Sequence, residues 1–281
     1  DILASWRRLI YANRPISAAF RFAHWKRDTV ECLLWGGQPV PFSPSRTSEL
    51  SALPPTATVA VWKARVPPDF LTQLETGPWR LLEVEDGFIR SVGLGADCVP
   101  PLSIVVDDLG VHYDGTRPNR LEEMLANGDL APDDLSRARN LREKLVRSGV
   151  SKYAVAPSVV LPRLGGTKRH VLVVGQVEDD RSVLFGSGTV RSNLDLLKQA
   201  RAAAPDAWII YRPHPDVEAG HRKGAIPEKI ARELADQIEP AQPISALIAL
   251  ADEVQVMTSL AGFEALLQGK AVSTHGMPFY A

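Results

Sequence analysis

The chain has 281 residues, of which 45% are hydrophobic and 23% charged, and this is the composition of an ordinary globular protein with room for two domains. A formal net charge of −1 gives no reason to expect nucleic-acid binding. The two cysteines, Cys32 and Cys98, have neither metal-binding nor disulfide-framework spacing, and no apolar run is long enough to span a bilayer. Because no signal-peptide pattern is present either, we expect a cytoplasmic protein that is soluble or peripheral to a membrane.

The first thirty residues are basic and include two tryptophans. The cations of this segment are Arg7, Arg8, Arg14, Arg21, Lys26 and Arg27, and its tryptophans are Trp6 and Trp25. A basic segment with interleaved tryptophans can lie on an anionic membrane surface. The simpler interpretation, which we slightly prefer, is a solvated helix face whose tryptophans pack inward. Contact of residues 1–30 with a membrane surface is the alternative.

The first half of the chain is predicted to form short strands separated by proline-containing loops. Strands are expected at 56–62, 79–84 and 103–106, and a further extended stretch at 111–113. Helices are expected at 121–126 and 132–148. The second of these carries acidic residues in its first turn, basic residues near its end and Gly149 after its last residue, which are the usual signals of helix ends.

The second half has the alternation of strands and helices that is typical of an α/β fold. A Pro- and Gly-rich linker at 157–170 separates the expected first domain, residues 1–156, from the second, residues 171–281. The continuously apolar stretch at 171–175 predicts a buried parallel strand. Further strands are expected at 208–211, 253–257 and 271–274, and helices at 192–204, 244–251 and 260–267. This β-α-β-α-β-α-β run predicts a Rossmann-like half, and the whole chain two α/β domains with a cleft between them.

Four short motifs follow predicted strands, in a fixed order along the chain. They are Glu85-Asp86-Gly87, Gln176…Asp180, His214-Pro215 and Thr258-Ser259. In open α/β proteins the carboxyl ends of the strands line the ligand crevice, so we expect these side chains to converge on one cleft. Taken one at a time, each motif has a simple structural explanation, as a turn, a surface acidic triplet, a loop histidine or a helix cap.

Two of the motifs are suited to binding a phosphate. His214 lies between two prolines at the end of a strand, where its imidazole could donate to a phosphate while Arg212 supplies positive charge. Thr258 and Ser259 lie at the start of a helix, where free N–H groups and the helix dipole attract anions. Glu264, on the second turn of that helix, is placed either to accept ribose hydroxyls or simply to be solvated.

The other two motifs offer carboxylates for chemistry on a sugar. One of Glu178, Asp179 and Asp180 could capture an oxocarbenium-like centre as a nucleophile, and the residues alone leave open which one. Glu85 could take a proton from an acceptor hydroxyl as a general base. Two acids from different domains facing one cleft would suit sugar transfer from a nucleotide donor by double displacement. No Gly-rich phosphate fingerprint, Walker sequence or Asp-x-Asp motif is present, which disfavours NAD enzymes, P-loop enzymes and metal-dependent transferases.

Three further cations follow predicted strands or turns, namely Lys63, Arg90 and Arg117. Surface solvation is the default expectation for each of them. If the substrate is an acidic sugar, some of these cations would instead meet its carboxylate, because charge-assisted hydrogen bonds are the strong ones.

With these motifs the chain resembles the KpsC-type retaining β-Kdo glycosyltransferases of bacterial capsule polysaccharide biosynthesis. The matching stretches are VEDGFIRSVGLG at 84–95, PLSIVVDDLGVHYDGTR at 101–117, GQVEDDRS at 175–182, YRPHPD at 211–216, MTSLAGFEAL at 257–266 and HGMPFYA at 275–281. Their combination is specific. The Glu-Asp-Gly, His-Pro and Ser/Thr motifs are also similar to those of bacterial sialyl- and polysialyltransferases, which use CMP-activated acidic sugars.

The resemblance implies a GT-B-like pair of Rossmann-like domains, CMP-β-Kdo as donor and a β-Kdo-terminated, phosphatidylglycerol-type glycolipid as acceptor. The reaction would take place at the cytoplasmic face of the inner membrane, with retention of configuration and without a metal or other cofactor. The resemblance also implies that Asp180 is the nucleophile with Gln176 supporting it, and that Glu85 is the acid/base. His214 and Ser259 would hold the CMP phosphate. The other donor-binding candidates are Arg212, Pro215, Thr258 and Glu264.

Within this family, the Gly-Gln-Val-Glu-Asp-Asp form is more similar to the C-terminal, β-2,7-forming module of KpsC, whose neighbour makes the β-2,4 bond. One module's length implies a dissected module or a single-module relative, and family members usually continue beyond Ala281 with Gly-Trp-Gly. Two alternatives are left. One is an inverting, sialyltransferase-like enzyme, which needs no nucleophile, and the other is a non-catalytic capsule export or scaffold module. No motif fixes the linkage, the acceptor length or the oligomeric state.

Overall fold

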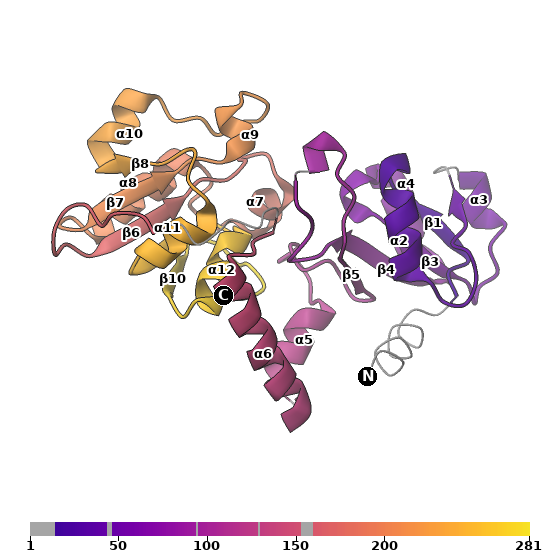
Figure 1. Ribbon diagram of the computed structural model, residues 1–281. Coiled ribbons are helices and arrows are strands. Elements are labelled where there is room, and N and C mark those ends of the chain that lie inside the picture. Colours follow the sequence, from indigo (N-terminus) through magenta and orange to yellow (C-terminus); the bar gives the residue numbers. More distant parts are fainter. Residues whose placement is uncertain (1–14, 44–46, 94, 129, 153–159) are drawn as a thin grey trace. The chain divides into compact units, whose positions relative to one another are not determined.

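The computed structural model describes residues 15–43, 47–93, 95–128, 130–152 and 160–281, which form two compact units (Figure 1). The first unit comprises the described residues up to Val111 together with Pro118–Glu123 and Lys152. The second comprises His112–Arg117, Met124–Ser151 and the described residues from 160 onward. The expected domains, 1–156 and 171–281, differ from these units in their assignment of His112–Arg117 and Met124–Ser151, and they stay a prediction.

The first unit contains a five-stranded sheet in the order β2-β1-β3-β4-β5. Its strands are β1 (Ala18–Phe20), β2 (Phe42–Ser43), β3 (Thr58–Val61), β4 (Arg80–Asp86) and β5 (Ile104–Asp107). The first four are parallel, and β5 pairs antiparallel with β4. Apart from that antiparallel edge strand, this is the flavodoxin-like strand order. The carboxyl ends of β1, β3 and β4 therefore lie at the same end of the sheet.

Apolar side chains cover both faces of this first sheet. The helices of the unit are α2 (Arg27–Leu34), α3 (Thr47–Ser51) and α4 (Pro68–Thr76), and its 3-10 turns are η1 (His24–Lys26), η2 (Lys63–Arg65) and η3 (Gly95–Asp97). On one face, Val84 of β4 belongs to a core with Leu34 of α2. On the other face, Val61 of β3 belongs to a core with Leu74 of α4. Both faces of the sheet are thus closed by helices.

The second unit contains a five-stranded, fully parallel sheet in the order β10-β9-β6-β7-β8. Its strands are β6 (His170–Val174), β7 (Trp208–Arg212), β8 (Gln237–Ile238), β9 (Glu253–Val256) and β10 (Ala271–Thr274). The first strand of the run, β6, is central, and the chain moves outward first to β7 and then, on the other side, to β9. This Rossmann order has its topological switch point between β6 and β9, where ligands usually bind. The predicted Rossmann-like half is confirmed.

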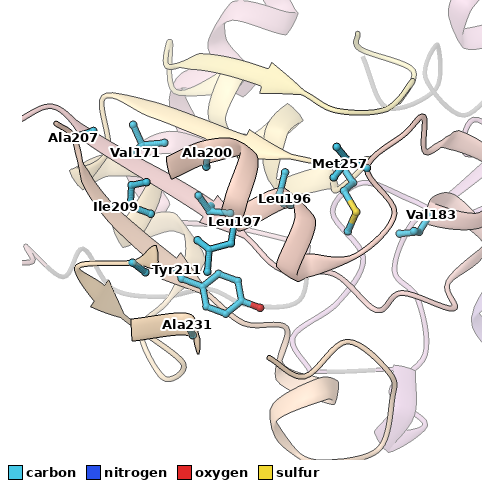
Figure 2. Close-up of a cluster of buried hydrophobic side chains, with 13 residues drawn as sticks. Val171, Val183, Leu196, Leu197, Ala200, Ala207, Ile209, Tyr211, Ala231 and Met257 are labelled. Atoms are coloured by element: carbon cyan, nitrogen blue, oxygen red, sulfur yellow. The ribbon is translucent and has the colours of Figure 1, made fainter. Parts of the chain in front are cut away.

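Helices α8 and α10 pack on one face of the second sheet, and α11 and α12 on the other. The helices assigned from residue 120 onward are α5 (Arg120–Asn127), α6 (Pro132–Ser148), α7 (Arg181–Gly186), α8 (Asn193–Ala203), α9 (Pro215–Glu218), α10 (Glu228–Leu234), α11 (Ile244–Leu250) and α12 (Leu260–Leu267). Leu196 and Leu197 of α8 pack with Val171 and Ile209 of the sheet (Figure 2). Leu247 of α11 lies in the core of the opposite face.

The α/β class is confirmed, but the first half contains helices that the sequence did not indicate. Residues 27–34 and 68–76 are helical and not loops, and Pro68 does not oppose this because proline is well tolerated in the first turn of a helix. The extended stretch expected at 111–113 is also wrong. The N–H of Val111 bonds to the Glu83 carboxylate at 2.9 Å instead of to a neighbouring strand, and the chain turns there. By contrast, α6 has its predicted bounds and is capped by Gly149, whose φ is 62°.

Candidate active site

A pair of side-chain hydrogen bonds joins the two strand ends at the switch point of the second sheet. Gln176 follows β6 and Thr258 follows β9, and both are buried. The Gln176 amide oxygen accepts from the Thr258 N–H at 2.8 Å, and its NH₂ group donates to the Thr258 hydroxyl at 3.1 Å. Two of the four predicted motifs are therefore brought together directly.

A residue that the motifs did not reveal, Asn193, anchors the loop after β6. Its side chain is fully buried, and its amide oxygen accepts from the Gln176 N–H at 2.8 Å. Its NH₂ group donates to the carbonyl oxygens of Gln176 and Gly224, each at 2.8 Å. Gly224 has a φ of +128°, and a Cβ there would lie 2.6 Å from the Asn193 amide nitrogen. Asn193 follows the Ser192 cap of α8, which is the one sequence signal near it.

The three consecutive acids after Gln176 have three different environments. Glu178 accepts the backbone N–H of Asn193 at 2.7 Å, so its carboxylate is used to hold the loop. Asp179 forms an exposed ion pair with Arg222 at 3.1 Å. Asp180 caps the start of α7 by accepting from the hydroxyl and N–H of Ser182, at 2.7 and 3.3 Å, and its side chain is exposed. Asp180 is therefore the member of the three that is exposed without an ion pair among the described residues.

His214 follows β7 and is held in one tautomer by the start of α9. Its Nδ1 accepts the backbone N–H of Asp216 at 3.2 Å, so in the neutral ring the proton is on Nε2. Burial lowers the pKa of His214, which the charge of Asp216 partly opposes, and the charge of Asp180 also raises it. The lowered pKa makes the ring a neutral donor at neutral pH.

The residues near His214, Arg212 and Pro215, make contacts that stabilise the backbone. Arg212 is half-buried and donates to the carbonyl oxygens of Gln242 and Pro213. Burial lowers the pKa of its guanidinium. Pro215 occupies the first turn of α9, where its missing N–H is not needed. These contacts fix the backbone that carries the imidazole.

Ser259 precedes α12 as its cap and Glu264 lies on the helix, and the side chain of Tyr280 contacts this region. The Ser259 hydroxyl caps the helix by accepting the N–H of Ala261 at 3.2 Å, as predicted. The Tyr280 hydroxyl donates to the Ser259 carbonyl oxygen. Gly262 leaves room for that ring, because a Cβ there would lie 2.4 Å from the Tyr280 oxygen. Burial, with a contribution from the charge of Glu264, raises the pKa of the Tyr280 hydroxyl.

In the first unit, Glu85 and Asp86 are the last two residues of β4, which is longer than predicted because it pairs with β5 up to Asp86. Asp86 forms ion pairs with Lys26 at 3.3 Å and with Arg90 at 2.9 Å. Burial raises the pKa of Glu85 from 4.5 to about 7, and the charge of Asp86 adds to the rise. The N–H of Asp86 donates to the Glu85 carboxylate at 2.9 Å, and this hydrogen bond lowers the pKa of Glu85.

The three cations predicted to meet a substrate carboxylate each lie beside a carboxylate of the protein. Lys63 is buried and its ammonium lies 3.2 Å from the Glu83 carboxylate. Arg90 is 1% exposed and pairs with Asp86. Arg117, in the second unit, is half-buried and lies 3.7 Å from the Asp114 carboxylate. A role of these cations toward a substrate stays a prediction.

Of the predicted basic segment, residues 1–14 lie outside the described residues. Within the described part, Lys26 is buried and Arg21 donates to the Arg65 carbonyl oxygen at 2.6 Å. No helix among the described residues has the length and apolar character needed to cross a bilayer. The described residues also contain no group of three or more His, Cys, Asp and Glu side chains arranged to hold a metal ion. Membrane contact and metal independence stay predictions.

A model of one protein family, described as "Capsule polysaccharide biosynthesis protein", matches residues 75–156 and 151–281. The chain belongs to this family. The predicted KpsC-type recognition is confirmed by this match together with the relatives and structures that follow. The candidate site residues Glu85, Gln176, Asp180, His214 and Ser259 all lie within the matched regions.

Two kinds of curated relatives share substantial identity with the chain. The capsule polysaccharide modification protein LipA of Neisseria meningitidis serogroup B is 48% identical over 202 residues, which are 72% of this chain and 28% of LipA. The lipopolysaccharide-processing protein LpsZ of Rhizobium meliloti is 41% identical over 206 residues, which are 72% of this chain and 46% of LpsZ. The chain thus aligns with less than half the length of these relatives.

Two solved structures of Thermosulfurimonas dismutans KpsC are similar to this chain over nearly all of its length. Its β-Kdo 2,7 transferase has a TM-score of 0.72 and 32% identity, covering 95% of this chain and 80% of that one. Its β-Kdo 2,4 transferase has a TM-score of 0.75 and 26% identity, covering 96% of this chain and 83% of that one. The similarity therefore includes both units of the chain.

Proposed function

We propose that the chain is a retaining β-Kdo glycosyltransferase that moves Kdo from CMP-β-Kdo to a β-Kdo-terminated glycolipid of capsule assembly. The observation that carries the proposal is the environment of Asp180. Asp180 presents an exposed carboxylate in the loop after β6, at the switch point, and the chain is 32% identical to a KpsC β-Kdo transferase. A GT-B-like arrangement, with the donor bound to the second unit and the acceptor to the first, completes the proposal.

In the first step, a carboxylate oxygen of Asp180 attacks the anomeric carbon of Kdo. The bond from that carbon to the phosphate oxygen breaks, and CMP leaves with the bonding electrons. A glycosyl ester of Asp180 is formed. The leaving phosphate is already a stable anion, so the step needs electrostatic stabilisation more than proton donation. No metal is required for it.

In the second step, a hydroxyl of the acceptor Kdo attacks the same carbon while Glu85 takes its proton. The bond to Asp180 breaks and its carboxylate is restored, so two inversions give overall retention. A general base is most effective when its pKa lies near the working pH. The pKa of about 7 at Glu85 supports this role.

The remaining polar groups of the second unit are assigned to the donor. His214 would donate from Nε2, and Ser259 from its hydroxyl, to the CMP phosphate at the start of α12. Arg212 adds positive charge, Pro215 fixes the backbone beside the imidazole, and Glu264 accepts ribose hydroxyls. Gln176 and Thr258 hold the two loops together beneath the phosphate.

Among the cations proposed for the Kdo carboxylate, Arg117 is the most accessible. It is 30% exposed, whereas the side chain of Lys63 is 7% exposed and that of Arg90 fully buried. Lys63 and Arg90 would have to exchange a protein carboxylate for that of the sugar. Such an exchange is unfavourable because it leaves a buried charge uncompensated.

The linkage is proposed to be β-2,7, and the protein to work peripherally at the cytoplasmic face of the inner membrane. Sequence identity favours the 2,7 transferase, at 32% against 26%, whereas the TM-score favours the 2,4 transferase, at 0.75 against 0.72. We follow the identity, because side chains at the acceptor determine which hydroxyl reacts, and a TM-score compares only the backbone.

The test is an incubation with freshly generated CMP-Kdo and a synthetic acceptor ending in β-Kdo, followed by NMR of the product. A β-linked Kdo product, with a Kdo adduct on the peptide that contains Asp180, is expected. An α-linked product would instead establish the inverting, sialyltransferase-like reaction. CMP binding without any transfer to either a short or a long acceptor would support the non-catalytic scaffold.

A further inference from the structure

A cluster of buried charges surrounds Asp86, the residue that follows Glu85 at the carboxyl end of β4. Lys26, at the end of η1, reaches Asp86 from one side, and Arg90, four residues after Asp86, reaches it from the other. The two cations and one anion leave one net positive charge in this cluster. All three groups are largely shielded from solvent, because Lys26 is 5% exposed, Arg90 1% and the Asp86 side chain 18%.

Aromatic rings fix the position of the Lys26 ammonium. Its nitrogen lies 3.5 Å from the ring centroid of Trp62, the residue that follows β3, and 5.2 Å from that of Trp25. A cation over an indole face is attracted by the ring quadrupole, and the attraction is larger when both are desolvated. The positive charge is therefore held at a fixed distance from the end of β4.

Close packing also immobilises Arg90. Its Nε lies 2.9 Å from the Asp86 carboxylate, and its Nη1 donates to the Ser91 hydroxyl at 2.7 Å. A Cβ at Gly95 would lie 3.1 Å from Nη2, so a side chain there would require the guanidinium to shift by a few tenths of an ångström. Asp86 is thus clamped between two cations that have few alternative positions.

We propose that Lys26 and Asp86 are positioning residues of Glu85, whose opposite charges set the pH at which Glu85 exchanges its proton. The proposal rests on the assignment of Glu85 as the acid/base of the proposed function. Neither Lys26 nor Asp86 needs to touch the substrate for this role. Their effect is exerted through the field at the Glu85 carboxylate and, for Asp86, through its backbone N–H.

The groups that act on Glu85 have opposite signs, and this makes the proposal testable. Burial and the negative charge of Asp86 raise the pKa of Glu85. The N–H of Asp86 and the positive charges of Lys26 and Lys152 lower it. Arg90 acts on the same cluster through its ion pair with Asp86. Removal of the lysine and removal of the aspartate should therefore move Glu85 in opposite directions, which general damage to the fold would not do.

The experiment is an infrared titration of the Glu85 carboxyl group, taken as the difference between each protein and the same protein with Glu85→Gln. In the unsubstituted chain the titration midpoint is expected near 7. Lys26→Met should raise the midpoint and Asp86→Asn should lower it, each by about one pH unit. The double variant, which has the same net charge as the original cluster, should return toward the original midpoint.

The matched control is Arg80→Met, at the other end of the same strand, where Arg80 pairs with Asp108 at 3.3 Å. It should leave the midpoint unchanged. If Lys26→Met does not fold, Asp86→Asn alone still decides the sign, because the side chains are nearly equal in shape. Midpoints that move in the same direction, or that do not move, overturn the proposal.

The titration needs no sugar donor, so it is independent of the proposed function. If the midpoints move as expected but no Kdo is transferred, the proposed function fails and the electrostatic control of Glu85 is retained. If Kdo is transferred but the midpoints do not move, the proposed function is retained and this inference fails. The acidic limb of the pH–rate profile should follow the infrared midpoint in each active variant.

Discussion

The two strand-end sites of this chain keep their acidic groups in opposite ways. At the end of β4 the charges are buried and compensated by one another, with Asp86 between Lys26 and Arg90. At the switch point of the second sheet, hydrogen bonds to backbone groups fix the loop, and Asp180 is exposed as a helix cap. The first arrangement tunes a proton affinity, whereas the second positions a carboxylate without removing it from water.

This difference suits the two roles that the proposed double displacement assigns to Glu85 and Asp180. A general base must hold and release a proton near the working pH, and burial is the means by which proteins raise the pKa of a carboxyl group. A nucleophile must be accessible to its substrate, and the Asp180 carboxylate, which caps the start of α7, is exposed. The comparison can be tested by substitutions that keep the structural contacts of each side chain and remove its carboxylate.

The largest effect is expected from Asp180→Asn. Asparagine caps helices as well as aspartate does, so α7 should keep its start and the melting temperature should change little. Loss of the nucleophile should lower the transfer rate by a factor on the order of 10³ or more. The rate is measured with CMP-Kdo and a β-Kdo acceptor, and mass spectrometry checks that the adduct is absent.

Asp179→Asn is the control for this prediction. It removes an exposed ion pair with Arg222, and such pairs contribute little to stability, so the rate should stay within a few-fold of the original. If Asp179→Asn abolishes transfer while Asp180→Asn does not, Asp179 is the nucleophile and the assignment from the loop geometry is wrong.

The next largest effect is expected from Glu85→Gln, which should lower the transfer rate by about 10²- to 10⁴-fold. The acidic limb near pH 7 should disappear from the remaining activity. Whereas Glu85→Gln lowers the transfer rate, it should raise the stability of the folded chain above pH 7. The folded chain keeps a proton on Glu85 between pH 4.5 and about 7 that the unfolded chain has released, so its stability falls as pH rises through this range.

The Gln variant lacks this pH-dependent loss. Above pH 7 it should therefore be more stable than the original chain, by at most about 3 kcal/mol, and near pH 4 the two should be similar. Denaturant unfolding at several pH values measures the difference. If the difference in stability between the Gln variant and the original chain is the same at pH 5 and at pH 8, Glu85 titrates normally and burial does not raise its pKa.

An effect mainly on stability, with a smaller effect on the transfer rate, is expected from Asn193→Ala. The substitution leaves the buried N–H and carbonyl of Gln176 without their partner and costs about 3 kcal/mol. Ser192→Ala is the matched control, because it removes only the cap of α8 and costs about 1 kcal/mol. If both variants lose the same stability, the amide network does not hold the loop.

How far the sequence predicts this chain depends on how local the signal is. In the second unit, the strands β6, β7, β9 and β10 and the helices α8, α11 and α12 follow from apolar runs and from caps such as Ser192 and Ser259, and these predictions are confirmed. The short helices α7, α9 and α10 were not predicted. The motifs at the strand ends follow from the same pattern. The helix α2 was missed because its eight residues contain few strong helix signals, and the two- and three-residue strands β1, β2 and β8 are too short for any periodicity.

The contacts that tune the sites are not local, and the sequence did not indicate them. Lys26 meets Asp86 across 60 positions, and Asn193 meets Gln176 and Gly224 across 17 and 31. A buried lysine and a solvated lysine have the same letter, so Lys26 was read as part of a basic surface segment. Only the fold, which brings η1, β3 and β4 to one end of a sheet, reveals its partner.

The smallest effect is expected from His214→Asn, which separates the two hydrogen bonds of the imidazole. Asparagine can still accept the N–H of Asp216 and cap α9, so stability should be retained. The donor at Nε2 is lost, and CMP should bind about tenfold more weakly, which is the usual worth of a hydrogen bond to a charged group. Because burial holds the pKa of His214 below its ordinary value, the ring is neutral through neutral pH, and its contribution should not fall as pH rises from 7 to 8. A CMP affinity that declines over this range in the original chain, but not in His214→Asn, would mean that the phosphate is held by a protonated imidazole, and the lowered pKa would then belong to the ligand-free chain only.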